Sequence, residues 1–130
     1  MHRRGWLIGV LVVAVPFVTT ACSSSSSSTS GSSGGATTDV SGQSSTSISA
    51  QDFFFTPSSL TGTAGQKVTI SLTNDGSAAH NFSITDQNVD VTVQPGQSQD
   101  IKVTFPESGS VQFFCSFHQS QGMVGTLAVA

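Results

Sequence analysis

Hydrophobic and polar residues alternate with a period of two through most of the chain after residue 46. In the segment KVTISLTN, the apolar residues Val68, Ile70 and Leu72 alternate with hydroxyl side chains. Such alternation indicates half-buried strands, because successive side chains of a strand point to opposite faces. Similar runs predict eight strands, at residues 47–54, 59–63, 67–73, 80–84, 89–93, 98–105, 110–115 and 124–129.

Turn-forming residues separate these runs. Asp75-Gly76 and Pro95-Gly96 are two such pairs. The segment shows no amphipathic helical run of useful length. The pattern predicts an all-β fold, namely an antiparallel Greek-key β-sandwich of seven or eight strands that spans residues 47–130. Most of the nine phenylalanines are expected in its core.

The first 21 residues are typical of an export signal. Arg3 and Arg4 precede an apolar stretch, residues 6–18, that is too short to cross a bilayer comfortably. The segment VTTAC resembles the bacterial lipobox, which would make Cys22 a lipidated N-terminus and membrane anchor. We therefore expect an exported protein on the outer face of a bacterial cell membrane, or a secreted or periplasmic one if Cys22 is not lipidated. Twin-arginine export and an uncleaved anchor remain open.

Residues 22–46 are expected to be a disordered linker. After Cys22 the segment is almost entirely Ser, Thr and Gly, with Asp39 as its only charge. Such a composition buries too little apolar surface to offset the loss of chain entropy on folding. The segment is therefore predicted to tether a folded domain of residues 47–130.

The charged residues exclude one class of partner. Beyond Arg3 and Arg4, the chain carries only Lys67 and Lys102 against seven acidic residues. Because no basic patch is available to neutralise phosphates, nucleic-acid binding is not expected.

The residues that could bind a metal through sulfur or imidazole are few and clustered. Residues 47–130 contain only His80, Cys115, His118 and Met123 of these types, and the last three lie in the segment FFCSFHQSQGMVG. Two imidazoles, one thiolate and one thioether are the ligand set of a type 1 copper site, in which methionine is a weak axial ligand. The sequence therefore predicts one copper ion that cycles between Cu(I) and Cu(II).

The same residues allow other interpretations. A structural zinc site is the main rival, although thioether is a poor zinc ligand. Cys115 could instead be a buried core thiol or form a disulfide with Cys22. A hydrolase is disfavoured because no Ser-His-acid spacing is evident.

The segments FFCSFHQSQGMVGTLAV and AAHNFSI resemble the copper loop and the first-histidine strand of the cupredoxins, especially the plastocyanin and pseudoazurin branch. The resemblance implies that Asn81 ties the His80 strand to the Cys115 loop near Ser116. It also implies that His118 reaches the surface through an apolar patch, where redox partners dock transiently. Candidates for this patch are Ala78, Ala79, Phe117, Gly122 and Val124. Phe117 departs from the pattern, since proline is frequent at this position.

The resemblance implies a one-electron carrier rather than an enzyme. A copper scavenger or delivery module is the alternative, because the same ligands could hand copper to an acceptor protein. A single methionine in a complete ligand set favours the carrier, which we expect to be a monomer. A cell-surface adhesion domain would leave the ligand set unexplained.

Overall fold

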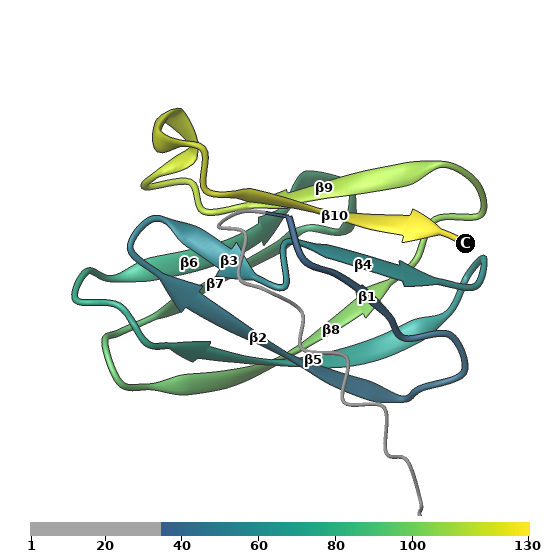
Figure 1. Ribbon diagram of the computed structural model, residues 1–130, viewed down its shortest axis with the longest axis horizontal. Coiled ribbons are helices and arrows are strands. Elements are labelled where there is room, and N and C mark those ends of the chain that lie inside the picture. The colour runs from purple at the N-terminus through teal and green to yellow at the C-terminus, as the bar shows by residue number, and fades with distance from the viewer. Residues whose placement is uncertain (1–34) are drawn as a thin grey trace, which may run out of the picture. The chain divides into compact units, whose positions relative to one another are not determined.

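Ten strands form two β-sheets that pack against each other in the computed structural model, which describes residues 35–130 (Figure 1). The first sheet has six strands, in the order β1 (Thr37–Asp39), β4 (Ser59–Gly62), β10 (Val124–Val129), β9 (Ser110–Phe114), β6 (His80–Ile84) and β7 (Val89–Val93). The second has four, in the order β3 (Phe54–Thr56), β2 (Ser45–Gln51), β5 (Lys67–Asn74) and β8 (Ser98–Thr104). The predicted all-β sandwich is confirmed.

Short 3-10 turns are the only helical elements within residues 35–130, at η1 (Thr85–Gln87) and η2 (Gln119–Gln121). None of the described helices is long and apolar enough to cross a membrane. The predicted signal peptide, Cys22 and the first part of the predicted linker lie outside the described residues.

Alternating burial along the strands produces the core between the sheets. In β5 the even-numbered residues Val68, Ile70, Leu72 and Asn74 are buried, and the odd-numbered ones are more exposed. Three aromatic rings lie at the centre: Phe82 stacks on Phe113 with ring centroids 4.8 Å apart, and Phe55 meets both edge to face. Aromatic rings bury large apolar areas, so this cluster supplies much of the core's stabilisation.

Strand pairing is mixed rather than purely antiparallel. β4 pairs in parallel with both β1 and β10, and β2 pairs in parallel with β5. Alternating hydrophobicity identifies a strand and its buried face, but it does not determine the direction of its neighbour. The parallel pairs form between strands that are not joined by a hairpin, as such pairs require.

The predicted boundary of the linker at residue 46 is wrong, because the folded domain begins earlier. Thr37–Asp39 forms β1 along the edge of β4, and Val40 is fully buried. The side-chain amide of Gln66 donates to the carbonyl oxygens of Val40 and Gln43, at 2.7 and 2.9 Å. Backbone pairing and one buried valine are therefore enough to hold a segment of otherwise polar composition.

The predicted strand at residues 47–54 is also interrupted. β2 ends at Gln51 and β3 starts at Phe54, with a turn at Asp52 and Phe53 between them. This turn exposes Phe53 and Phe54, and Phe117 is exposed on the loop before β10. Most of the phenylalanines were expected in the core, but only Phe55, Phe82, Phe105 and Phe113 of those in residues 35–130 are fully buried.

Candidate metal centre

His80 is held at the start of a completely buried strand. All five residues of β6 are buried, and β6 pairs with β7 on one side and β9 on the other. The buried Asn74 shapes the preceding loop: its side-chain amide donates to the carbonyl oxygens of Ala78 and Val93, both at 2.8 Å. Its Oδ1 atom accepts the N–H of Gly76 at 2.9 Å. These bonds fix the direction from which His80 enters the site.

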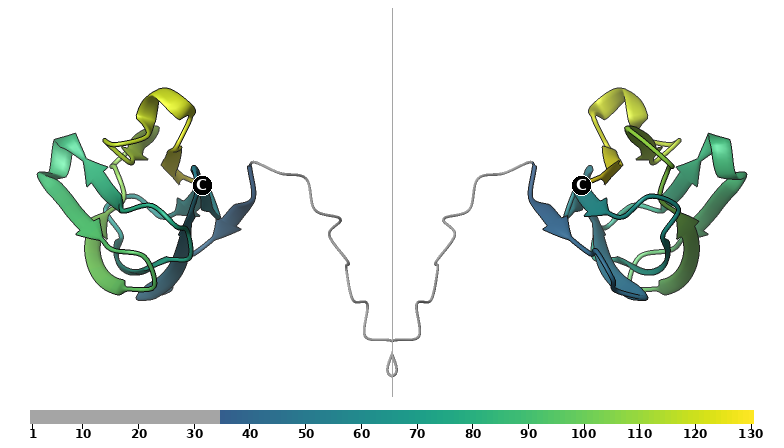
Figure 2. Two further views of the ribbon diagram at one scale, coloured as in Figure 1. Left: turned by 90° about the vertical axis from the view of Figure 1, so that its left-hand side faces the viewer. Right: turned by 90° about the vertical axis from the view of Figure 1, so that its right-hand side faces the viewer.

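Cys115 and His118 lie on the loop between β9 and β10, at one end of the sandwich (Figure 1). Figure 2, left, views the domain from this end. The loop is closed by backbone bonds, from the Cys115 N–H to the Met123 carbonyl at 3.0 Å and from the His118 N–H to the Cys115 carbonyl at 3.1 Å. Gly122 adopts a left-handed conformation with φ 87°, which ends η2 and turns the chain into β10.

Three ligand atoms converge although they come from two distant segments. The Nδ1 atoms of His80 and His118 lie 3.1 Å apart, and Cys115 Sγ lies 3.9 Å from the first and 3.5 Å from the second. A point at the centre of this triangle is about 2 Å from all three atoms, close to the roughly 2.0–2.3 Å bonds that imidazole and thiolate make to zinc. The three donors therefore fit one small, thiophilic metal ion.

Met123 lies at the end of the loop, directly before β10. It is fully buried, and its N–H donates to the His118 carbonyl at 3.3 Å. Its backbone is thus bonded to both Cys115 and His118. Cys115 and His80 are also fully buried, whereas His118 is partly exposed. Of these four residues, only His118 is therefore reached by solvent.

Asn81 and Ser116, which the family resemblance links, are in direct contact. The Ser116 N–H donates to Asn81 Oδ1 at 2.6 Å, and Asn81 Nδ2 donates to Ser116 Oγ at 2.7 Å. The same amide nitrogen also contacts Asp90 Oδ1 at 2.7 Å. This network joins β6 to the loop that carries Cys115.

Asp52 is a site residue that the sequence analysis missed. Its Oδ1 atom lies 2.9 Å from Nε2 of His80, and the side chain is 31% exposed. Hydrogen bonds from the backbone N–H groups of Ser77 and Ala78 hold the pKa of Asp52 below its ordinary value, with a smaller contribution from His80. Interpreting residues 47–54 as one strand hid the turn that brings Asp52 to the site.

The neighbouring Phe53 was missed for the same reason. Its ring centroid lies 4.6 Å from that of His118 and 6.3 Å from that of His80. Phe117 meets His118 from another direction at 6.3 Å. Of the predicted patch, Phe117 and Gly122 are exposed, and Ala78, Ala79 and Val124 are partly buried. The surface next to His118 therefore carries two exposed aromatic rings.

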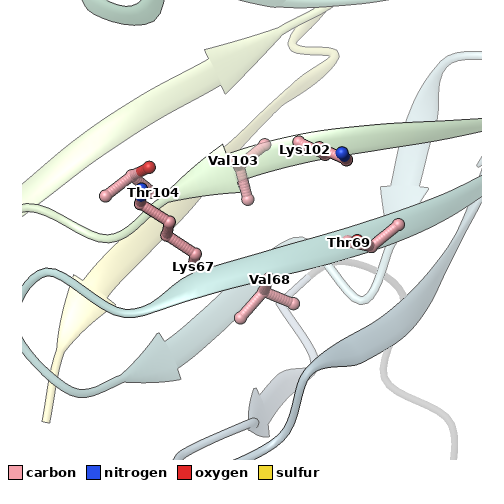
Figure 3. Close-up of a pocket in the computed structure, with 6 residues that line it drawn as sticks. All are labelled: Lys67, Val68, Thr69, Lys102, Val103 and Thr104. Carbon is pink, nitrogen blue, oxygen red and sulfur yellow. The ribbon is translucent and has the colours of Figure 1, made fainter.

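A shallow hollow on the second sheet contains none of the candidate ligands. It lies along β5 and β8 and is lined by Lys67, Val68, Thr69, Lys102, Val103 and Thr104 (Figure 3). The candidate metal ligands converge instead at the end of the sandwich that carries the loop between β9 and β10.

Comparisons with known proteins agree with this arrangement. A family model described as "Cupredoxin-like domain" matches residues 11–129. Plastocyanin A/B of Petroselinum crispum is 33% identical over 85 residues, which cover 58% of this chain and 86% of the relative. The plastocyanin of Cucumis sativus is 28% identical over 89 residues, with the same coverage of 58% and 86%.

Among solved structures, a dithionite-reduced auracyanin from the photosynthetic bacterium Roseiflexus castenholzii is similar in fold. It superposes with a TM-score of 0.55 at 22% identity, and the match covers 75% of this chain and 99% of the auracyanin. The metal-binding domain of the Cu(I)-exporting P-type ATPase of Streptococcus pneumoniae superposes with a TM-score of 0.60 at 14% identity, covering 73% and 96%. At these identities the structural likeness shows the fold alone.

Proposed function

Since this chain belongs to the family of cupredoxin-like domains, we propose that it is a type 1 copper protein that carries single electrons between partner proteins. The observation that carries the proposal is the triangle of His80 Nδ1, His118 Nδ1 and Cys115 Sγ, with edges of 3.1, 3.5 and 3.9 Å. Thiolate and imidazole in one plane are the strong ligands of a blue-copper site.

Four residues would hold the copper. His80, His118 and Cys115 would supply the strong ligands, and Met123, buried on the same loop, would be the candidate for a fourth, weaker ligand. Bound copper would supply a one-electron couple between Cu(I) and Cu(II). The thiolate and thioether favour Cu(I), and the imidazoles accept both oxidation states.

The protein's own contribution is to keep these ligands in place when the charge of the site changes. The Asn81 backbone N–H points at Cys115 Sγ at 3.4 Å and so stabilises negative charge on the sulfur. Backbone bonds fix the loop, and the strands beneath it are buried. Little rearrangement is then needed when one electron enters or leaves.

His118 is the proposed exit for electrons because it is partly exposed, whereas His80 is fully buried. The aromatic rings of Phe53 and Phe117 flank it, and the predicted patch residues Ala78, Ala79, Gly122 and Val124 would complete the apolar surface. Redox encounters use small interfaces, so a patch of this kind is sufficient for transient docking.

The carrier function is tested by loading residues 36–130 with copper and cycling the electrode potential in the presence of a Cu(I) chelator. A carrier gives a reversible one-electron wave and keeps its copper through many cycles. A delivery module, the alternative function, would lose copper to the chelator on the first reduction.

We also propose that the protein works outside the cytoplasm, anchored through a lipid on Cys22. The proposal is supported by the arginines, apolar stretch and lipobox-like VTTAC at the start of the sequence. Expression of the full chain in a bacterial host tests it. We expect the wild type in the membrane fraction and the Cys22→Ala variant in the soluble fraction. The same distribution of the two proteins between these fractions would contradict the proposed anchor.

A further inference from the structure

The turn between β2 and β3 holds one imidazole of the metal centre through a carboxylate. Asp52 Oδ1 lies 2.9 Å from His80 Nε2 and 3.2 Å from the Ala78 N–H, and Oδ2 accepts the Ser77 N–H at 2.8 Å. The carboxylate is thus fixed from three directions. A carboxylate accepts hydrogen bonds, so His80 must donate from Nε2. The lone pair of Nδ1 then points toward Cys115 and His118.

Gly76 makes this contact possible. A Cβ atom at Gly76 would collide with Oδ1 of Asp52 and would lie 2.9 Å from Nε2 of His80. Only a residue without a side chain leaves room for the carboxylate and the imidazole to meet here. The Asp75-Gly76 turn and Asp52 therefore form one arrangement around the outer nitrogen of His80.

We propose that Asp52 is a positioning residue of the copper centre, which fixes the tautomer of His80 and lowers the reduction potential by stabilising Cu(II). The proposal deepens the proposed function and rests on it. Hydrogen bonds from ligating histidines to carboxylates orient the ring and make it a stronger donor. A negative charge one imidazole away from the metal favours the more positive ion.

Three variants separate this role from a general effect of charge or of loop structure. Asp52→Asn keeps an oxygen that can accept the Nε2–H but removes the charge, and Asp52→Ala removes both. Asp100→Asn removes one charge from β8, which lies at the opposite edge of the same sheet from β3, and serves as the control. Each variant is loaded with copper, and its reduction potential and its visible and electron paramagnetic resonance spectra are recorded.

The proposal predicts that Asp52→Asn weakens Cu(II) binding about tenfold relative to Cu(I). For one electron this corresponds to a rise in potential of about 59 mV. Asp52→Ala should raise the potential at least as far and also alter the copper spectra, since the ring orientation is no longer fixed. Asp100→Asn should leave both unchanged. If the reduction potentials of the Asp52 variants equal that of Asp100→Asn, the proposal is overturned.

The tautomer is measured separately on metal-free protein by nitrogen-15 nuclear magnetic resonance. The wild type should carry its proton on Nε2 of His80, and Asp52→Ala should give a mixture of tautomers. An unchanged tautomer in Asp52→Ala would overturn the positioning role even if copper binds. Absence of a copper–thiolate spectrum in the wild type would instead overturn the proposed function, and the tautomer measurement would still decide whether Asp52 orients His80.

Discussion

The backbone N–H of Asn81 points at Sγ of Cys115, at a distance of 3.4 Å. The two residues lie 34 positions apart in the sequence, and this contact joins the strand of the first histidine to the loop that holds the other ligands. The contact fixes the position of the sulfur beside the two imidazoles.

The side chain of Asn81 should be essential for holding the loop. Asn81→Ala removes the acceptor of the Ser116 N–H, and we expect it to lower the free energy of unfolding by about 1–3 kcal/mol. Copper affinity should fall by roughly 10–100-fold, as for other residues that orient ligands. Ser116→Ala, which keeps the backbone bond, is the matched control and should have a smaller effect in both urea unfolding and copper competition. Equal effects of the two variants would contradict this role.

Gly125 should tolerate no side chain. It pairs with Phe113 across β10 and β9, and a Cβ atom there would collide with the Phe113 ring and lie 2.6 Å from the Ser58 carbonyl oxygen. Gly125→Ala should therefore destabilise the domain by about 1–3 kcal/mol through overpacking. Thermal unfolding measures this, with Thr126→Ala on the same strand as a control of little effect. An unchanged midpoint in Gly125→Ala would show that the core can relax around the added methyl group.

The segment before residue 47 should contribute to stability. Val40 is fully buried, so Val40→Ala should reduce the free energy of unfolding by about 1–3 kcal/mol. Thr38→Ala, on an exposed position of β1, should change it by less than about 0.5 kcal/mol. Denaturant unfolding of residues 36–130 compares the two. Equal stabilities would restore the view that this segment is only a linker.

The aromatic surface around His118 should control electron exchange. Phe117 is 54% exposed, and Phe117→Glu places a charge where two copper-loaded molecules would have to meet. Electron self-exchange, measured by nuclear magnetic resonance line broadening, should slow while the copper spectrum stays unchanged. Gln112→Glu adds the same charge on β9, away from the loop, and should leave the rate near that of the wild type. Equal rates in the two variants would exclude docking at Phe117.

The sequence predicted the positions of the strands and the convergence of His80, Cys115 and His118 for a physical reason. Alternating burial reveals a strand directly, and the segment from Cys115 to Met123 concentrates residue types that are otherwise almost missing from the domain. Asp52 and Phe53 left no such pattern, because an Asp and a Phe within a run such as SAQDFFF are compatible with a strand. Their role depends on a turn that only the tertiary contacts with Ser77, Ala78 and the histidines make visible.

The start of the folded domain was predicted too late in the chain, because the composition of residues 22–46 is an average that hides a single buried residue. Residues 37–46 are almost as polar as a linker, yet one strand can add to the edge of β4 through backbone bonds alone. Only Val40 marks the attachment, and a single valine in a polar segment is too weak a pattern to predict burial.

The central claim is that His80, Cys115, His118 and Met123 form a type 1 copper site, and the visible absorption spectrum tests it most directly. One equivalent of Cu(II) is added to purified residues 36–130, with Cys115→Ser as the control. We predict an intense blue or green thiolate-to-copper band that is absent in the control and disappears on reduction with ascorbate. A colourless or faintly coloured wild-type protein would contradict the copper site and the electron-carrier function, and zinc or Cu(I) binding would be tested next.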